Sequence, residues 1–258
     1  MNAPLDQITP VILTFNEEAN IARTLAGLHW ARRIVVIDSG STDGTHAVLT
    51  ADPRVELHQR AFDTHANQWN FGLAQVSGGW VLSLDADYRI TPPLQRALAA
   101  AIAEVNDQPG EVVAGFSIPF RYCVFGKPLS GTVLPPRIAL FRAGYGSYVD
   151  DGHTQDLVLS GRAGTLVEPI LHDDRKALER WLWAQQRYMR RETEKLLATP
   201  DRQLSMADRL RKRTWLAPLA MVVMCLLLKR TAFDGWRGWY YAFQRAYAEL
   251  LLLLMLML

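Results

Sequence analysis

Asp85 and Asp87 directly follow a short apolar segment, residues 80–84, about one third of the way along the chain. The segment reads Trp-Val-Leu-Ser-Leu and predicts a buried strand. Open α/β sheets bind ligands at the carboxyl ends of their strands, so the two acids are expected at such a mouth. Paired carboxylates suit a hard divalent cation whose coordination is completed by phosphate oxygens and water. The spacing therefore predicts a metal site for a ligand that carries a diphosphate.

Two further apolar segments, residues 8–15 and 34–37, also end in polar clusters. The first precedes Asn16-Glu-Glu18, and the second leads into Asp38-Ser-Gly-Ser-Thr-Asp43. In a parallel β-α-β arrangement the carboxyl ends of such strands lie side by side, which predicts a nucleotide-sized crevice. The acids expected to line this crevice are Glu17, Asp38, Asp85 and Asp87.

A helix is expected after each of these two strands. Asn16 has the side chain of a helix cap and precedes apolar residues at helical spacing over 21–28. Ser41 or Thr42 could cap a second helix that passes through residues 48–49. The pattern of strands alternating with helices indicates an α/β fold.

Four segments, taken in chain order, resemble the landmarks of family 2 glycosyltransferases with the glycosyltransferase A fold. They are Thr14-Phe-Asn-Glu-Glu18, Val36-Ile-Asp-Ser-Gly-Ser-Thr-Asp43, Asn70 within Trp69-Asn-Phe-Gly72, and Leu82-Ser-Leu-Asp-Ala-Asp87. Within this family the chain is most similar to the lipopolysaccharide core β-glucosyltransferase group. The resemblance is strong over residues 8–95 and fainter beyond. It implies a Rossmann-like mixed sheet flanked by helices and inverting transfer from a UDP-sugar.

The resemblance also implies roles for residues at matching positions. The nucleotide sugar is expected to contact Thr14, Asn16, Glu17, Asp38, Ser41, Asp43, Asn70 and Asp85. Within this set, Glu17 suits ribose hydroxyls and Asp38 suits the imide N–H of uracil. Mn²⁺ or Mg²⁺ would be held mainly by Asp87, with Asp85 near the metal and the ribose, and with His172 as the late histidine of this fold. Ordinary capping of a helix is the alternative for Asp38, Ser41 and Asp43, and a structural role is the alternative for His172.

Inverting transfer also requires a general base that takes a proton from the acceptor hydroxyl. A later cluster rich in such groups is Asp150-Asp-Gly-His-Thr-Gln-Asp156. The resembling group carries a His-Glu pair here, whereas Thr154 and Gln155 stand nearest in this chain. The candidates for the base are Asp151, His153 and Asp156. Asp151 is placed first because the resembling group also has an acidic turn at that point.

Composition fits a cytoplasmic enzyme with an appendage. The chain has 258 residues, 49% of them hydrophobic, which allows a full α/β core and is too low for a polytopic membrane protein. Cys123 and Cys225 lie far apart without the spacing of metal ligands, so neither a disulfide framework nor a zinc site is expected. The first residues lack the basic segment and apolar core of a signal peptide, so the catalytic domain is expected to remain where nucleotide sugars are made.

Charge divides the chain into two parts. Residues 1–174 carry 12 Lys/Arg against 19 Asp/Glu, a net charge of −7, whereas residues 175–258 carry 16 against 7, a net charge of +9. We therefore expect a nucleotide-sugar-binding catalytic domain over residues 1–174. A helical, basic and apolar region that associates with a membrane is expected over residues 175–258.

The membrane expectation depends on two apolar segments of the second region. Residues 215–228 follow the basic run Arg209-Leu-Arg-Lys-Arg213 and would rise about 21 Å as a helix, less than the roughly 30 Å of a hydrocarbon core. Residues 250–258 follow aromatic residues at helical spacing and are also short. Both segments suit an interfacial or re-entrant position, peripheral or monotopic, on anionic lipids at the cytoplasmic face of the inner (plasma) membrane. Packing against the catalytic domain or within a homo-oligomer is the alternative.

The remaining segments give a coarse map. The expected elements are a helix from Pro92 that ends before Pro109, strands at 112–122, 138–141 and 164–167, and a long helix through 178–196. Residues 126–136 are rich in Gly and Pro and form either a lid beside the active site or a plain surface connection.

These patterns together predict an inverting, metal-dependent glycosyltransferase that acts on a lipid-linked glycan in cell-envelope polysaccharide or lipopolysaccharide synthesis. A catalytically degenerate, nucleotide-sugar-binding membrane partner is the alternative, because the base region differs from that of the resembling group. A nucleotidyltransferase is disfavoured because the first strand is not followed by a Gly-rich basic loop. Nucleic acid is not an expected partner, because the cations adjoin Leu/Met-rich sequence instead of alternating with aromatics and glycines.

Overall fold

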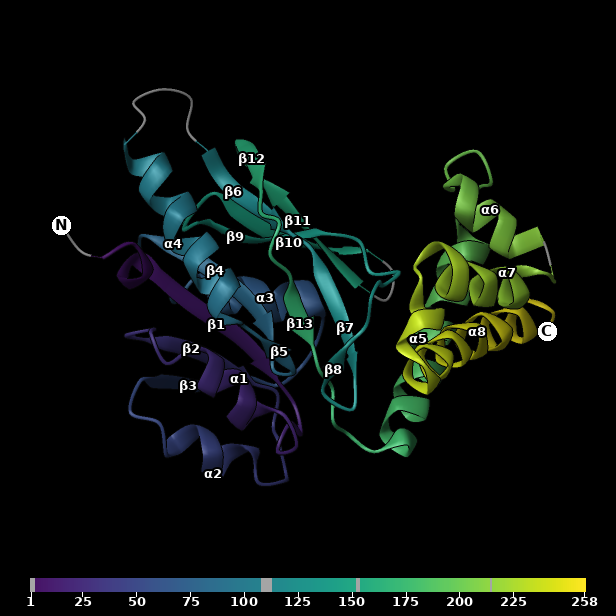
Figure 1. The fold of residues 1–258 in the computed structure, drawn as a ribbon, viewed down its shortest axis with the longest axis horizontal. Coiled ribbons are helices and arrows are strands. Elements are labelled where there is room, and N and C mark those ends of the chain that lie inside the picture. Colours follow the sequence, from purple (N-terminus) through teal and green to yellow (C-terminus); the bar gives the residue numbers. More distant parts are fainter. Residues whose placement is uncertain (1–2, 108–112, 152–153, 214) are drawn as a thin grey trace. The chain divides into compact units, whose positions relative to one another are not determined.

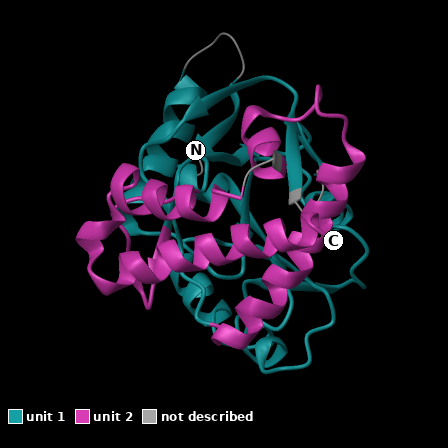
Figure 2. Ribbon diagram, turned by 90° about the vertical axis from the view of Figure 1, so that its right-hand side faces the viewer, with its two compact units in different colours: residues 1–121, 134–150, 155–175 teal, residues 122–133, 151–154, 176–258 magenta. Residues whose placement is uncertain are grey.

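The computed structural model of the chain describes residues 3–107, 113–151, 154–213 and 215–258 (Figure 1). It divides into two compact units, which Figure 2 shows in two colours. The first unit comprises residues 1–121, 134–150 and 155–175, and the second comprises residues 122–133, 151–154 and 176–258.

A mixed sheet is the centre of the first unit. Among the described residues it has seven strands in the order β12-β6-β9-β4-β1-β2-β3. Their bounds are β1 Ile8–Thr14, β2 Ile34–Asp38, β3 Val55–Gln59, β4 Trp80–Asp85, β6 Val113–Ile118, β9 Arg137–Arg142 and β12 Arg162–Thr165. Strands β4, β1, β2 and β3 are parallel, β9 runs antiparallel to both β4 and β6, and β12 is parallel to β6. The predicted α/β mixed sheet is confirmed.

The register of the parallel strands brings the predicted polar ends together. Thr14 at the end of β1 pairs with Asp38 at the end of β2, and Leu13 pairs with Asp85 at the end of β4. The prediction that three strand ends lie side by side is therefore confirmed.

Helices cover both faces of the sheet in the first unit. The helices are α1 Ile21–Gly27, α2 Thr45–Thr50, α3 His65–Leu73 and α4 Pro92–Asp107, with a 3-10 turn η1 at Pro4–Gln7. Alternate residues of β1 enter different cores, because Ile12 packs with residues of α1 and α4, whereas Val11 packs with residues of α3. The side of α3 that faces the sheet is very close to it, since a Cβ on Gly72 would lie 2.8 Å from Val11 Cγ1.

Both predicted helix caps are wrong. Helix α1 begins after Asn20 and α2 begins after Gly44, and neither residue makes a side-chain cap. Asn16 instead adopts a left-handed backbone conformation, with φ of 56°, and its Oδ1 accepts a hydrogen bond from the Thr42 backbone N–H. Asn16 and Ser41 therefore bind the neighbouring loop, whereas Asp43 accepts hydrogen bonds from the backbone N–H and the hydroxyl of Thr45, the first residue of α2.

Short strand pairs complete the first unit. Strand β5, Tyr88–Arg89, pairs antiparallel with β13, Ile170–His172, and β10, Gly146–Asp151, pairs with β11, Thr154–Leu159. The single strand predicted over residues 112–122 is interrupted, because Pro119 lies between β6 and β7, Phe120–Val124. Proline lacks the N–H that would continue a strand ladder.

The second unit is mainly helical. Its helices are α5 Leu178–Ala198, α6 Met206–Arg213, α7 Ala217–Val223, a π-helical turn η2 at Met224–Leu228, a 3-10 turn η3 at Thr231–Asp234, and α8 Trp236–Leu256. Met189 and Leu196 of α5 pack with Ala248 and Leu252 of α8 in a small core. Strand β7 pairs here with β8, Lys127–Pro128. In the described part of the chain, we find no helix with the length and apolar character needed to cross a membrane.

Arg211 lies inside this second unit. Its guanidinium donates to Glu249 Oε2 at 3.0 Å and to Glu192 Oε1 at 3.1 Å, and both glutamates are buried. Lys212 is also paired, with Nζ 3.1 Å from Asp201 Oδ1. Two cations of the 209–213 run therefore bind acids of their own unit.

The loop after β8 is held by the C-terminal helices. Ser130 donates from its backbone N and its Oγ to the two carboxylate oxygens of Asp234, at 2.8 and 2.7 Å. The Tyr241 hydroxyl accepts from the Val133 N–H at 3.0 Å and lies 3.1 Å from Thr132 Oγ1. The sequence predicts a lid or a surface connection over residues 126–136. Within this segment, residues 130–133 are anchored at both ends.

Candidate active site

Asp87 and His172 face each other at the end of strand β4. The Oδ2 atom of Asp87 lies 3.0 Å from Nε2 of His172. Strand pairing explains this contact, because β13 places His172 opposite Tyr88, the residue after Asp87. Two of the three predicted metal ligands are therefore in direct contact.

The charges at this end of β4 act on one another. Burial and the charge of Asp87 raise the pKa of Asp85. Burial opposes the protonated form of His172, but the nearby carboxylates, Asp87 first among them, together outweigh burial and raise the pKa of His172. Carboxylates held close together in a buried place are a setting that suits a bound cation.

Asp173 secures the segment that carries His172. Its backbone N–H donates to the Asp87 carbonyl oxygen at 3.0 Å. Its buried carboxylate accepts hydrogen bonds from Arg175 Nε at 2.7 Å and Arg89 at 3.1 Å. Burial acts against the ionised form, but Arg175 and Arg89 lower the pKa of Asp173. This ion-pair network fixes the backbone of Asp173, which follows His172 and donates to the Asp87 carbonyl oxygen.

Asn20 joins the same region to helix α1. Its Nδ2 donates to Glu17 Oε2 at 2.7 Å and to Asp174 Oδ1 at 2.8 Å. Its Oδ1 accepts from Arg23 at 2.7 Å and from the Arg175 backbone N–H at 2.8 Å. Sequence reasoning missed Asn20 and Asp173, although an Asn before a helix and an Asp-Asp-Arg run after a strand were visible signals.

The loops after β1 and β2 are tied together by their side chains. The backbone N–H groups of three successive residues, 16 to 18, donate to Ser41 Oγ at 2.8 Å, Thr45 Oγ1 at 2.7 Å and Asp43 Oδ2 at 3.2 Å. Burial raises the pKa of Asp43, but hydrogen bonds from Thr45 outweigh this effect and lower it. Ser41 and Asp43 thus hold the loops after β1 and β2 together, and their contact with a nucleotide stays a prediction.

Asp38 is fully buried in the turn that follows β2. Its Oδ2 accepts from the backbone N–H groups of Gly40 at 3.1 Å and Ser41 at 2.9 Å, and its Oδ1 accepts from Ser41 Oγ at 2.5 Å. These bonds close the turn and do not cap α2. Thr14, paired beside it, has a buried Oγ1 with no hydrogen-bond partner among the described residues. The nucleotide contacts of Asp38 and Thr14 stay predictions.

Asn70 holds a wall of the site. Its Nδ2 donates to the Tyr148 carbonyl oxygen at 2.9 Å, and its Oδ1 accepts from the Tyr148 N–H at 2.8 Å. The Tyr148 ring stacks on Trp69, with ring centroids 5.1 Å apart and planes 25° apart. Asn70 is therefore a positioning residue for this aromatic pair, and a contact with the donor stays a prediction.

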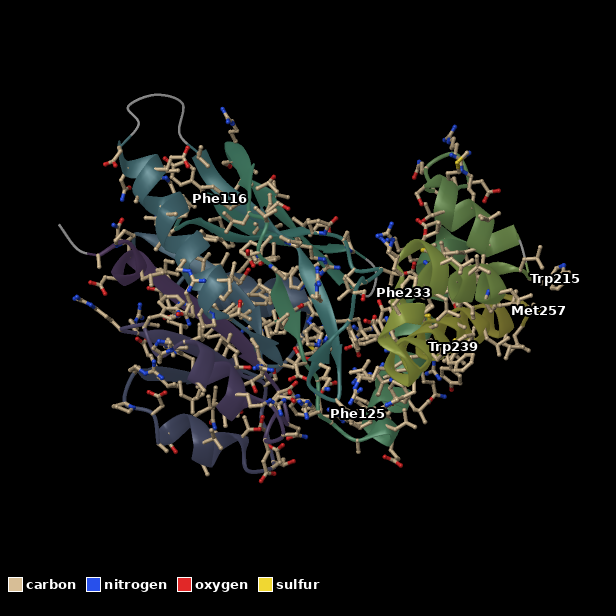
Figure 3. The ribbon with its side chains drawn as sticks, viewed as in Figure 1. Phe116, Phe125, Trp215, Phe233, Trp239 and Met257 are labelled. Carbon is tan, nitrogen blue, oxygen red and sulfur yellow. The ribbon has the colours of Figure 1, made fainter. Side chains whose placement is uncertain are left out.

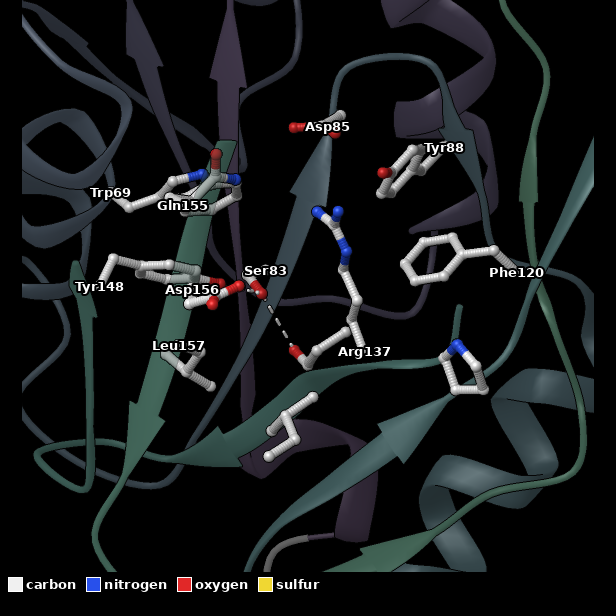
Figure 4. A pocket seen from close by; sticks show the side chains of 13 residues that line it. Trp69, Ser83, Asp85, Tyr88, Phe120, Arg137, Tyr148, Gln155, Asp156 and Leu157 are labelled. Carbon is white, nitrogen blue, oxygen red and sulfur yellow. Dashed lines mark hydrogen bonds between the residues drawn. The ribbon is translucent and has the colours of Figure 1, made fainter. Parts of the chain in front are cut away.

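A cavity of about 290 Å³ lies beside Asp85 (Figure 4). Its lining residues are Trp69, Ser83, Asp85, Tyr88, Phe120, Pro136, Arg137, Ile138, Ala139, Tyr148, Gln155, Asp156 and Leu157. Figure 4 shows the Arg137 guanidinium pointing to the end of the cavity that holds Asp85 and Tyr88. Aromatic faces with a few polar groups suit a sugar ring. Sequence reasoning missed Trp69 and Arg137, because no motif links elements so far apart in the chain.

The three candidates for the base differ in what the structure describes. Asp156 lines the cavity from β11. The backbone of Asp151 ends β10, but its side chain and all of His153 lie outside the described residues. Gln155, which with Thr154 stands nearest the position of the His-Glu pair of the resembling group, also lines the cavity.

The donor set fits a divalent cation in chemical type. Two carboxylates can supply protein ligands to Mg²⁺ or Mn²⁺, and an imidazole suits Mn²⁺ as a further ligand. As arranged, the described residues contain no group of three or more His, Cys, Asp or Glu that would hold a metal alone. Phosphate oxygens and water are the remaining ligands that such a site would use.

Residues 9–133 match the family described as "Glycosyl transferase family 2". These residues, just under half of the chain, belong to glycosyltransferase family 2. The predicted family, which rests on the segments around Asp38 and Asp87, is confirmed.

Two curated relatives match parts of the chain. The lipopolysaccharide core biosynthesis glycosyltransferase LpsC of Rhizobium meliloti is 28% identical over 147 residues, 55% of this chain and 53% of that protein. An undecaprenyl-phosphate 4-deoxy-4-formamido-L-arabinose transferase of Yersinia pestis is 32% identical over 127 residues, 44% of this chain and 39% of that one. The chain thus spans about half or less of the length of these relatives.

Among solved structures, S. aureus TarS 1-349 in complex with UDP covers 94% of this chain and 90% of its own length, with 13% identity and a TM-score of 0.49. Glucosyl-3-phosphoglycerate synthase from Mycobacterium tuberculosis covers 71% of this chain and 79% of its own, with 19% identity and a TM-score of 0.45.

Proposed function

We propose that the chain is an inverting glycosyltransferase that moves a sugar from a UDP-sugar to a lipid-linked glycan. The observation that carries the proposal is the placement of Asp85, which ends β4 and lines a cavity of about 290 Å³ with aromatic walls. Beside it, Asp87 and His172 supply groups suited to a cation. A site for a leaving diphosphate therefore adjoins a site for a sugar ring.

Two relatives support the cell-envelope setting. The R. meliloti relative is named for lipopolysaccharide core biosynthesis, and the Y. pestis relative is named for an undecaprenyl-phosphate substrate. Both names point to acceptors built on lipids. With this support we propose that the reaction belongs to lipopolysaccharide or cell-envelope polysaccharide synthesis, and we propose the cytoplasmic face of the inner membrane as its location.

A divalent metal is part of the proposal, since glycosyltransferase A enzymes commonly use one. Asp87, Asp85 and His172 are the residues that would hold Mn²⁺ or Mg²⁺. The ion would neutralise charge that develops on the leaving diphosphate. Asp85 and Asp87 would contribute the carboxylates that hold the ion. The hydrogen bonds of Asp173 with Arg175 and Arg89 keep the segment that carries His172 in place.

Asp156 is the proposed base that takes the proton of the acceptor hydroxyl. It is a carboxylate on the same cavity as Asp85, and the neighbouring Gln155 amide cannot accept a proton at neutral pH. The bond from the sugar to the UDP oxygen breaks as the acceptor oxygen attacks from the opposite side, which inverts the configuration.

The direct test is a donor screen with purified protein. UDP release is measured for several UDP-sugars with Mn²⁺, with and without lipid-linked acceptors, in the wild type and in Asp156→Asn. We expect acceptor-dependent release with one donor, and a large loss in the variant. Failure to release UDP from any donor, with acceptor present, would overturn the proposal.

A catalytically degenerate binding partner is the second candidate. Gln155, which with Thr154 stands nearest the position of the His-Glu pair of the resembling group, lines the cavity. This candidate predicts metal-dependent UDP binding by calorimetry without turnover for any donor and acceptor pair. Gain of turnover in Gln155→Glu would support it, since a single carboxylate would then have restored the base.

A further inference from the structure

One face of α8 is apolar and exposed along its whole length. The exposed residues on this face are Trp236, Trp239, Phe243, Tyr247, Leu250, Leu254 and Met257. They recur at intervals of three and four residues, which keeps them on one side of a helix. From Trp236 to Met257 the stripe is about 31 Å long at the usual helical rise.

The segment before α8 adds a second exposed apolar surface. Its members from α7, η2 and the residues just before them are Trp215, Leu216, Leu219, Val223, Leu227 and Leu228. Helix α7 packs against α8, and Phe233 in the turn between them is 85% exposed. Figure 3 shows Trp215, Phe233, Trp239 and Met257 on these helices. We call the exposed apolar side chains of residues 215–258 the docking face.

The buried side of α8 carries polar as well as apolar side chains. Gln244 and Glu249 are buried there, and Glu249 accepts a hydrogen bond from Arg211. The guanidinium of Arg245 lies 5.6 Å from the Tyr241 ring centroid. A helix that crossed a membrane would have to carry these polar groups through hydrocarbon, whereas a helix lying flat exposes only its apolar side.

The exposed charges of residues 215–258 have one sign. Among the described residues from 215 to 258, the exposed charged side chains are Lys229 and Arg230. The acids of this segment are engaged elsewhere, because Asp234 binds Ser130 and Glu249 binds Arg211. The face therefore combines apolar area, tryptophans and cations, and it exposes no acid in its described part.

We propose that the docking face binds the surface of a bilayer that contains anionic lipids, with α8 lying in the interfacial plane. Tryptophan and tyrosine favour the head-group level, and Lys229 and Arg230 match the charge of anionic lipids. A symmetric contact between two copies would bring the same face to itself, and its cations would find no exposed acid there. Charge complementarity thus favours lipid over a second copy of the chain.

The apolar contribution is tested with two matched tryptophans. Trp239 on the docking face is 45% exposed, and Trp183 on α5 is 43% exposed, so each accepts a glutamate without a buried charge. Sedimentation with phosphatidylcholine vesicles, with or without phosphatidylglycerol, measures binding. We expect Trp239→Glu to weaken binding to both vesicle types about tenfold or more, and Trp183→Glu to leave it unchanged.

The charge contribution is tested with two matched pairs. Lys229→Gln with Arg230→Gln should weaken binding to phosphatidylglycerol vesicles about 30-fold, since each basic side chain near an anionic surface contributes about fivefold. The control is Arg96→Gln with Arg121→Gln, two exposed cations outside the docking face that change the net charge equally. Binding to pure phosphatidylcholine should change little in both.

Two outcomes would overturn the proposal. Equal effects of the docking-face and control variants would show that binding does not use this face. Wild-type protein that stays in the supernatant at low salt, together with a dimer by analytical ultracentrifugation that Trp239→Glu or Leu254→Glu converts to monomer, would assign the face to self-association. Circular dichroism and urea unfolding of each variant confirm that loss of binding is not loss of fold. The test does not depend on sugar transfer, so it succeeds or fails independently of the proposed function.

Discussion

The carboxylate of Asp87 and the imidazole of His172 are in contact, 3.0 Å from Oδ2 to Nε2, across a sequence separation of 85 residues. The antiparallel pairing of β5 with β13 produces this contact. A cation bound to Asp87 Oδ2 would exchange one hydrogen bond for a stronger electrostatic interaction. The contact therefore holds both side chains where a divalent cation would need them.

Asp87→Asn should reduce Mn²⁺-dependent UDP affinity about 100-fold or more, because a neutral amide removes a charged ligand from a buried site. Calorimetry with UDP, with and without Mn²⁺, measures the effect. Asp63→Asn is the control, since Asp63 is an exposed acid paired with Arg60. Equal affinities for the wild type and the folded Asp87→Asn protein would contradict the metal assignment.

Asp156→Asn should lower kcat about 100-fold or more while the Kd for UDP remains unchanged, as expected for loss of a general base. Steady-state kinetics and calorimetry on the same preparation separate the two quantities. Asp151→Asn is measured in parallel. If turnover falls in Asp151→Asn and not in Asp156→Asn, the base is Asp151.

Asn70→Ala should lower the free energy of unfolding by about 1 to 3 kcal/mol, because it leaves the backbone groups of Tyr148 without their amide partner. Asn67→Ala, on the exposed side of the same helix, should have a smaller effect. Urea denaturation measures both. A stable Asn70→Ala protein with weakened UDP binding would instead show that Asn70 contacts the donor directly.

Arg211→Gln should cost about 3 to 5 kcal/mol of stability, because two buried carboxylates would lose the guanidinium that lies between them. Arg209→Gln, at an exposed position two residues earlier, should change stability by no more than about 0.5 kcal/mol. Thermal and urea unfolding of the two variants provide the comparison. Similar stability of both would mean that Arg211 is solvated and not part of the helical core.

The parallel strands and their acidic ends could be predicted because each depends on a few neighbouring residues. An apolar run such as that before Asp85 predicts a buried strand wherever it occurs, and parallel connection then brings the strand ends together. The caps failed for the opposite reason. Asn16 and Ser41 have the side chains of helix caps, but each finds a better partner in the other loop, and this choice depends on tertiary structure.

The cavity and the basic segment show the same limit. Trp69, Arg137 and Gln155 come from α3, β9 and β11, and local periodicity does not report which elements share a cavity. Arg211 was grouped with its basic neighbours as a lipid contact, whereas the structure pairs it with Glu192 and Glu249. The sign of a local charge run therefore says little about which of its members reach solvent.

The anchoring of residues 130–133 bears on how the chain can be divided by proteolysis. Ser130 donates a hydrogen bond to Asp234, and the Val133 N–H donates to the Tyr241 hydroxyl. A fragment that ends at residue 175 would keep residues 130–133 and lose both of these partners. Pro136 and Arg137, the next residues to line the cavity, follow this loop directly. Cleavage near residues 174–175, where the net charge changes sign, would therefore remove the partners of residues 130–133. These residues lead directly into Pro136 and Arg137, so the cut would also loosen a wall of the cavity beside Asp85.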